Sequence, residues 1–204
     1  MPRLNGVSDR DAGLSAKIAF FFTKRKLAKM AGLKHLNDAN NIEMLEPLRM
    51  YAHIPRLLNA YGRLEQAESK LNVLSPRHRA LAELKSAMVV RCEYCIDLGS
   101  QIARSWGITD EELLALTDYR NAACFSEVDK LLLEYATAVS RTPVEVTDEL
   151  FDALRKHFDT PALVGLTHVI TLGNLRGRFN VALGIGSSGF SDGRVCALPG
   201  AGRA

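Results

Sequence analysis

The amino-acid sequence predicts an all-α protein, and three observations support this fold class. Apolar residues recur at helical spacing through most of the chain, Ser and Thr residues stand where helices would begin, and no segment alternates apolar and polar residues as a half-buried strand does. With 204 residues, 47% of them hydrophobic, the chain can bury a core of its own. We therefore expect a helical domain with a helical extension at its N-terminus.

The first expected helix covers residues 13–32. Its apolar residues gather on one broad side, and its second half is rich in Lys and Arg, which favour a helix C-terminus. A basic amphipathic helix can lie on a membrane surface, but we favour a helix that docks on the core or on a partner subunit over membrane contact. Residues 40–74 then predict a short helix, a break near Pro55, and a second helix.

Helix starts are clearest in the middle of the chain. Ser75 followed by Pro76 is typical of an N-cap and a first helical position. Thr109 with Glu112 three residues later forms a capping box, and Ser126 can cap the helix that follows it. These signals predict the start of three helices.

The end of the chain predicts two more helices and a tail. Residues 147–158 are amphipathic, and a Thr-Pro pair then starts a long helix over 162–185 that is apolar on most sides. Such a helix belongs in a core or in an oligomer interface. We therefore divide the chain into an N-terminal helical extension (residues 1–40), a main domain (41–190) and a Gly-rich flexible tail (191–204).

The composition argues against several classes of partner. The net charge of +3 and the lack of a long Lys/Arg tract argue against nucleic-acid binding. No apolar run approaches the roughly 18 residues that a membrane-spanning helix needs, and the N-terminus lacks the pattern of a signal peptide. We therefore expect a cytoplasmic protein. In that reducing compartment a Cys-x-x-Cys pair is catalytic or metal-binding more often than structural.

Cys92 and Cys95 form such a pair, in the stretch RCEYCIDLGS. A structural zinc site needs four ligands, but the other two cysteines are single and distant and the five histidines are scattered, so we expect no metal. The same ligand count argues against an iron–sulfur cluster, and thioredoxin-like chemistry needs a βαβ unit that this chain lacks. Two interpretations remain, a reactive dithiol or two buried cysteines that only pack.

The reactive interpretation has a physical basis. If the pair begins a helix, backbone N–H groups favour the thiolate and lower the pKa of one thiol. That thiolate can attack a peroxide, and the second thiol can then close a disulfide on the sulfenic acid. Asp97 lies beside the pair, but a carboxylate there would raise the pKa of a thiol rather than lower it.

The residues around the pair resemble a known family. The segment CEYCIDLGSQIARSWGITDEELLAL, preceded by one helix and followed by a capped one, is similar to the carboxymuconolactone decarboxylase family, which contains the AhpD-like alkylhydroperoxidases. The resemblance covers residues 45–190, and the later segment NLRGRFNVALGI extends it beyond the cysteines. It implies an all-helical fold that assembles into dimers, trimers or hexamers through long helices.

The resemblance also implies roles for individual residues. In the peroxidase branch the motif is Glu, then Cys-x-x-Cys, then His four residues after the second cysteine. Carried over, Cys95 matches the attacking thiol and Cys92 the thiol that resolves the sulfenic acid. The histidine position is Gly99, so that role is vacant. The glutamate position falls near Ala80, and Glu83, one turn later on the same helix face, is the candidate to replace it.

Three further residues could surround the pair. Tyr94 is a candidate for lining a substrate pocket, and Trp106 is expected to pack near the site. His168 lies in the apolar last helix and could approach the cysteines to replace the absent base. A core histidine with a satisfied hydrogen bond is the other interpretation of His168.

We therefore expect a thiol-dependent peroxidase or disulfide-exchange protein that uses Cys92 and Cys95 to reduce organic peroxides. Its electrons would come from an external thiol reductant, it would use no metal or organic cofactor, and it would form a homo-oligomer. Its activity should be weak, because general acid–base help is typically worth about 10²–10⁴-fold and the usual histidine is absent.

Two alternatives stay open. One is a non-redox lyase of the decarboxylase type, in which the cysteines only pack and Arg176 or Arg178 binds the carboxylate of an acidic lactone. The other is a non-catalytic helical oligomer that binds a ligand or a partner through its last helix.

Overall fold

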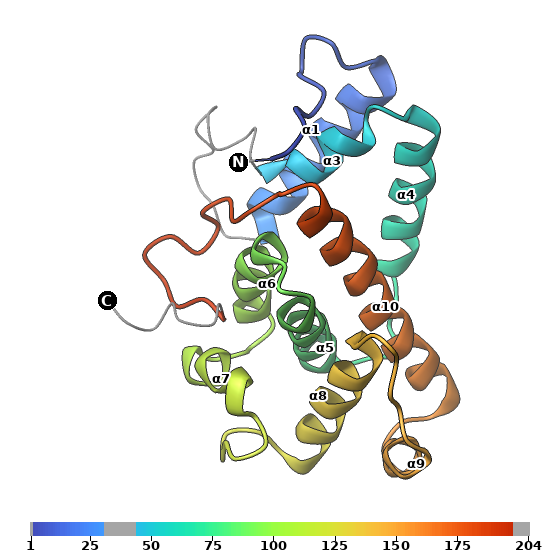
Figure 1. The fold of residues 1–204 in the computed structure, drawn as a ribbon, viewed down its shortest axis with the longest axis vertical. Helices are drawn as coiled ribbons and strands as arrows, with labels where there is room; N and C mark the ends of the chain where they lie inside the picture. Colours follow the sequence, from blue (N-terminus) through green and yellow to red (C-terminus); the bar gives the residue numbers. More distant parts are fainter. Residues whose placement is uncertain (1, 31–43, 198–204) are drawn as a thin grey trace.

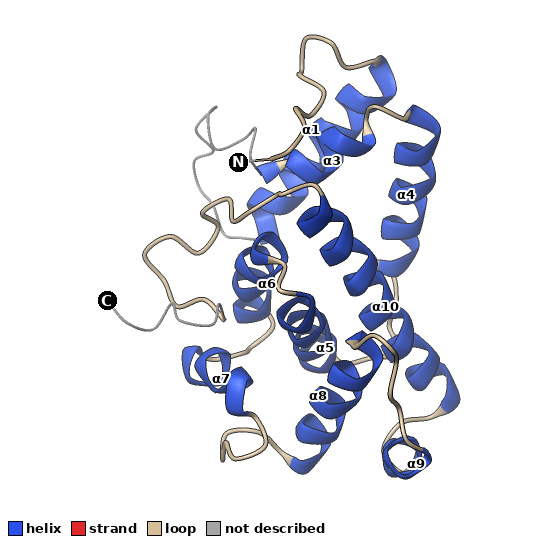
Figure 2. Cartoon of the chain, in the orientation of Figure 1, coloured by secondary structure: helices blue, strands red, loops and turns tan. Residues whose placement is uncertain are grey.

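The computed structural model describes residues 2–30 and 44–197, and its regular structure there is helical throughout (Figures 1 and 2). No strand occurs in either described range, so the expectation of an all-α fold is confirmed. The elements are α1 (Leu14–Met30), α3 (Glu46–Tyr51), α4 (Pro55–Glu68), α5 (Pro76–Val90), α6 (Glu93–Ser105), α7 (Asp110–Ala115), the 3₁₀ turn η1 (Leu116–Asp118), α8 (Glu127–Ser140), α9 (Asp148–Arg155) and α10 (Thr160–Ala182).

The helices begin at the capping residues that the sequence predicts. The Ser75 side chain accepts a hydrogen bond from the backbone N–H of His78, 3.1 Å away. Thr109 opens α7 with a complete capping box, and Ser126 opens α8 with another. The cap of α10 is Asp159 rather than the Thr-Pro pair, because its carboxylate accepts the free N–H of Ala162 at 2.9 Å.

Helix α5 forms the centre of the fold and packs against α6, α8 and α10 (Figure 1). It is therefore buried on several sides, as the full burial of Leu81, Ala82 and Ser86 shows. Helix α10 comes very close to α5, since a Cβ placed on Gly173 would lie 2.4 Å from the Ser86 hydroxyl. The glycine therefore permits a contact between the two helices that a larger residue would prevent.

A sharp reversal between α5 and α6 places the cysteine pair. Arg91 ends α5 in the left-handed conformation with φ 59°, and the N–H of Cys92 bonds to the carbonyl of Ala87 at 3.0 Å. The chain then turns directly into α6, so that Cys92 is the N-cap and Cys95 lies in the first turn. The expectation that the pair begins a helix is confirmed.

Helix α1 packs on α4 and α6 rather than standing apart (Figure 1). Its buried face carries Ala16 and Phe20, and the guanidinium of buried Arg49 holds the segment before it by bonding to the carbonyl of Val7 and the carboxylate of Asp9, both at 2.8 Å. Within the described ranges, no helix is long and apolar enough to cross a membrane.

The segment after α10 differs from the flexible tail that the sequence predicts from residue 191. Up to residue 197 it packs along α6, with Cys196 and Ala197 buried. The reason is Asp97, a buried carboxylate on α6 that binds several N–H and O–H groups of this segment, including the backbone N–H of Ser191 at 2.7 Å. The remaining residues of the predicted tail, 198–204, lie outside the described part of the chain.

Candidate active site around the cysteine pair

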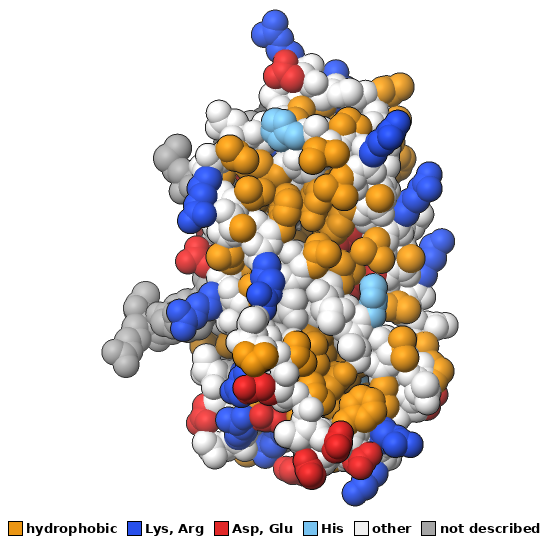
Figure 3. Space-filling model, turned by 45° about the vertical axis from the view of Figure 1, so that its right-hand side comes forward, with side chains coloured by type: hydrophobic (Ala, Val, Ile, Leu, Met, Phe, Trp, Pro, Cys, Tyr) orange, Lys and Arg blue, Asp and Glu red, His pale blue; other side chains and the backbone are white. Residues whose placement is uncertain are grey.

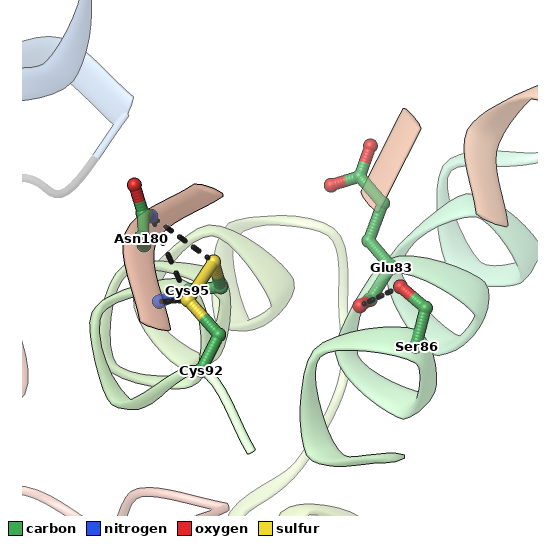
Figure 4. Close-up of a disulfide and its surroundings, with 5 residues drawn as sticks. All are labelled: Glu83, Ser86, Cys92, Cys95 and Asn180. Carbon is green, nitrogen blue, oxygen red and sulfur yellow. Dashed lines mark hydrogen bonds between the residues drawn. A yellow bond between two sulfur atoms is a disulfide. The ribbon is translucent and has the colours of Figure 1, made fainter. Parts of the chain in front are cut away.

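Cys92 and Cys95 are joined in a disulfide at the N-terminus of α6 (Figure 4). The Cys92 sulfur also acts as the helix cap, because it accepts the backbone N–H of Cys95 at 3.2 Å. A helix N-terminus favours negative charge, so the same position would stabilise a thiolate in the reduced pair.

The two cysteines have different surroundings. Cys92 is fully buried, with 0% of its surface exposed, whereas Cys95 is half-buried and lines a cavity. A molecule in the cavity can therefore reach the sulfur of Cys95 while the sulfur of Cys92 stays behind it.

This cavity has a volume of about 590 Å³ and lies between α1, α4, α5, α6 and α10. That volume suits a small organic molecule. Much of its wall is apolar or aromatic, with Phe22, Leu27, Leu48, Tyr61, Leu98, Trp106 and Phe179 among the lining residues.

One wall of the cavity carries a chain of ion pairs, which we call the cavity ion network: Glu65, Glu68, Arg79, Glu83 and Arg176. Arg176 of α10 binds Glu65 with two hydrogen bonds of 2.7 Å and Glu68 with one of 2.9 Å. Arg79 continues the chain, with Glu68 at 2.9 Å and Glu83 at 3.0 Å. Charges of opposite sign alternate along it, which is what makes their burial tolerable.

Glu83 is the member of the network that could hold a proton. Burial raises its pKa above the ordinary value for Glu, and the negative charge of Glu68 adds to this, while Arg176 and Arg79 oppose it. A carboxyl group with a raised pKa can serve as a general acid at higher pH than an exposed one. The structure brings Glu83 to the same cavity as Cys95.

Asn180 contacts the cysteine pair directly, and the sequence did not identify it. Its amide nitrogen donates to the sulfur of Cys95 at 3.5 Å and to that of Cys92 at 3.6 Å (Figure 4). The residue is 3% exposed, and its amide oxygen has no hydrogen-bond partner. The available signal was its spacing, because it follows Arg176 by one helical turn and so shares a face with it.

Gly99 lines the cavity on α6, where the resemblance places the family histidine. A Cβ at this position would lie 3.0 Å from Cδ2 of Leu84. A side chain could enter if Leu84 moved by a few tenths of an ångström, so packing alone does not forbid one here.

The other candidates divide between the cavity and elsewhere. Tyr94 and Trp106 line the cavity. The Tyr94 hydroxyl donates to the carbonyl of Met44 at 2.5 Å, and burial raises its pKa. His168 is not among the lining residues, because it lies roughly 18 Å from Asn180 along the axis of α10. The structure thus does not bring His168 to the cysteine pair within one chain, and Asp97 faces the C-terminal segment instead of the sulfurs.

The two arginines of α10 also separate. Arg176 lies in the cavity and is engaged by two carboxylates. Arg178 points elsewhere, donating to the hydroxyl of Thr142 at 2.7 Å and to the carbonyl of Ser140 at 3.4 Å. In the parts of the chain described, no three His, Cys, Asp or Glu side chains gather as metal ligands would.

Comparisons with known proteins agree with this fold. The model of the carboxymuconolactone decarboxylase family matches residues 55–138. The chain is 38% identical over 159 residues to the uncharacterized protein YnjA of Escherichia coli (strain K12), a match that covers 77% of this chain and 84% of YnjA.

Solved structures show the same arrangement of helices. The debrominase Bmp8, as a cysteine variant in complex with 2,3,4-tribromopyrrole, superposes with a TM-score of 0.71 at 18% identity, covering 89% of each chain. The alkylhydroperoxidase AhpD core of a peroxidase-related protein from Ralstonia eutropha JMP134 gives a TM-score of 0.57 at 21% identity, over 74% of this chain and 85% of that one. The chain belongs to the carboxymuconolactone decarboxylase family and has an AhpD-like fold.

Proposed function

We propose that the protein is a thiol-dependent peroxidase that reduces organic hydroperoxides with its Cys92–Cys95 dithiol. The observation that carries this proposal is the asymmetry of the pair: Cys95 lines a cavity of organic-molecule size, and Cys92 lies buried beside it. An attacking thiol needs access to substrate, whereas a resolving thiol needs access to its partner sulfur only.

The reaction balances with two thiols and one hydroperoxide. The Cys95 thiolate attacks the terminal oxygen of the hydroperoxide, so that the O–O bond breaks, a sulfenic acid forms on Cys95, and an alkoxide leaves. The Cys92 thiol then attacks the sulfenic sulfur, which forms the disulfide and releases water. The products are an alcohol, water and the Cys92–Cys95 disulfide, and an external thiol reductant returns the pair to its starting state.

Glu83 is the proton donor of this proposal. Its raised pKa lets the carboxyl group stay protonated at higher pH than in an exposed Glu, and in that form it can protonate the leaving alkoxide. No cofactor enters any step.

A homo-oligomer remains part of the proposal. Figure 3 brings the right-hand side of Figure 1 forward and shows hydrophobic side chains gathered over much of that face. Exposed apolar residues of α4 and α10, such as Leu57, Val164 and Leu175, support a partner subunit there.

The test is to trap the first intermediate. Reduced Cys92→Ser protein, treated with one equivalent of cumene hydroperoxide, should carry a sulfenic acid on Cys95 that dimedone labels and mass spectrometry locates. The wild-type protein should instead form the Cys92–Cys95 disulfide. Reduced protein that gives neither product while its thiols remain accessible to alkylation would refute the proposal.

The comparison with a debrominase adds a second reaction to examine at the same dithiol. A bromoarene and two thiols can give the arene, HBr and a disulfide, so electrons balance without another reductant. The largely apolar cavity favours this substrate class as well as organic hydroperoxides. The same mass-spectrometric assay with a bromopyrrole in place of the peroxide distinguishes the two.

The lyase alternative has less support. The cation that it would use in the cavity, Arg176, is already engaged by Glu65 and Glu68. A lactone carboxylate would have to displace one of these partners.

A further inference from the structure

We propose that Asn180 is the thiolate-binding residue of the dithiol, a role that rests on the proposed redox function and extends it to a residue of α10. Its amide N–H group lies within hydrogen-bond distance of both sulfurs, at 3.5 Å from Cys95 and 3.6 Å from Cys92. Whichever sulfur carries the negative charge in the reduced pair, the same donor reaches it.

The position of Asn180 is fixed by close packing. Three residues earlier on α10, a Cβ on Gly177 would lie 3.0 Å from a methyl group of Val90 and 3.4 Å from the Cβ of Cys92. The helix therefore runs directly against the turn that carries the cysteine pair. Asn180 itself is only 3% exposed, and a hydrogen bond is stronger at a site that is little exposed to solvent.

The other charged groups of the cavity do not take this role. The cavity ion network is paired within itself, and Lys26, Tyr51, Tyr61 and Tyr94 are the further titratable residues, besides the cysteine, that line the cavity. In the described part of the chain, the donors that bond to these two sulfurs are the backbone N–H of Cys95 and the amide of Asn180. Asn180 is thus the side chain that can stabilise the thiolate, as a positively charged group does at other reactive cysteines.

The amide also has an unsatisfied end. Its oxygen is buried and has no hydrogen-bond partner, and Figure 4 shows it turned away from the sulfurs. Leaving a buried acceptor unpaired is unfavourable. The amide is thus oriented with its N–H group toward the sulfurs, and its oxygen forms no hydrogen bond in that orientation.

The test is the pH dependence of thiol alkylation in the reduced protein, resolved to Cys95 by fragment mass spectrometry. Asn180→Leu removes the donor at similar volume, and we expect the pKa of the reactive thiol to rise by about one to two units. Below that pKa, alkylation of Cys95 should slow by about tenfold for each unit. Asn180→Asp keeps the shape but puts a carboxylate beside sulfur, so it should raise the pKa further.

The reduction potential gives an independent measurement. Losing a contact that stabilises the thiolate destabilises the reduced pair, so the potential of both variants should become more negative, by about 30 mV for each tenfold change in the exchange equilibrium. Asn174→Leu is the matched control, because Asn174 is another buried asparagine of α10 with an unpaired amide oxygen but does not line the cavity. It should change neither the pKa nor the potential.

Three results would overturn the inference: both Asn180 variants titrate like the wild type, Asn180→Asp lowers the pKa, or Asn174→Leu shifts it equally. If Asn180→Leu does not fold, Asn180→Ala removes the same donor and takes its place. None of these measurements uses a peroxide. If the variants show these shifts but the protein reacts with neither peroxides nor bromoarenes, the proposed function is refuted and the inference stands. If the protein reduces peroxides but the variants show no shifts, the inference is refuted and the proposed function stands.

Discussion

The polar groups on the two sides of α6 differ in their hydrogen bonding. On the side that faces the C-terminal segment, the Asp97 carboxylate accepts hydrogen bonds from the Ser187 hydroxyl at 2.6 Å and from the backbone N–H groups of Ser188, Phe190 and Ser191 at 3.1, 3.0 and 2.7 Å. Both carboxylate oxygens of Asp97 have hydrogen-bond partners there, as expected of a structural cluster.

On the cavity side some groups near the cysteine pair are open to a ligand or lack a partner. Cys95 lines the cavity, the position of Gly99 carries no side chain, and the amide oxygen of Asn180 is unpaired. One side of α6 therefore maintains the fold, and the other side is available for chemistry. Changes on the first side should alter stability, and changes on the second should alter reactivity.

The largest effect is expected from Cys95→Ser. Because the proposed nucleophile is lost, consumption of cumene hydroperoxide by the reduced protein should fall to the uncatalysed background. Its free energy of unfolding, compared with that of the reduced wild type, should change little. Cys124→Ser, which alters a half-buried free cysteine outside the cavity, is the control and should keep wild-type turnover. Residual activity in Cys95→Ser would place the nucleophile elsewhere.

Asp97→Ala tests the structural side. The buried N–H groups of Phe190 and Ser191 would lose their acceptor, so the free energy of unfolding should fall by about 3 kcal/mol, as urea denaturation would measure. Ser187→Ala removes one donor and leaves the rest of the cluster, and should lower it by about 1 kcal/mol. The rate of Cys95 alkylation should stay unchanged in both. If Asp97→Ala were as stable as the wild type, this side of α6 would not have the structural role assigned to it.

Gly99→His tests the vacant position on the cavity side. An imidazole there could accept and return protons beside Cys95, and we expect peroxide turnover to rise by about 10²-fold, the lower end of what general acid–base groups supply. Leu84 must move slightly to admit the side chain. Gly99→Leu makes the same steric demand without an imidazole and should give no gain. A similar rise in both variants would show that packing, not proton transfer, changed the rate.

Glu83→Gln should have the smallest effect, about tenfold or less on turnover at neutral pH. Because burial raises the pKa of Glu83, its protonated form persists above the range of an exposed Glu and is lost as the pH rises through that raised pKa. Wild-type turnover should therefore decline on the alkaline side, and Glu83→Gln should remove that decline. An unchanged alkaline limb would exclude Glu83 as the proton donor.

Local signals in the sequence were enough for the helices and for half of the site. Capping residues such as Ser75 and Thr109 act within one turn, so they could be identified without the fold. Cys92, Cys95 and Tyr94 share one short segment, and Glu83 lies on the helix before it.

The rest of the site depends on contacts between distant segments. Asn180 meets the sulfurs only because α10 crosses the turn before α6, and its spacing from Arg176 does not by itself indicate that contact. The order of residues 191–197 depends on Asp97, which the sequence offers only as a charge near the cysteines. His168 does not line the cavity, because the position of a residue along α10, and not its type, decides whether it reaches the cavity.

The place of α1 has a consequence for how such a site can diversify. Phe22, Lys26 and Leu27 form part of the cavity wall, yet the family match begins only at residue 55. The cysteine pair and this part of the cavity wall thus lie in different stretches of the chain. Substitutions at cavity-lining positions of α1 such as Phe22 can therefore reshape the cavity from outside the matched segment. Leu27 of the same helix also packs against the cluster that contains Cys92, so exchanging the whole helix would alter the surroundings of the dithiol as well.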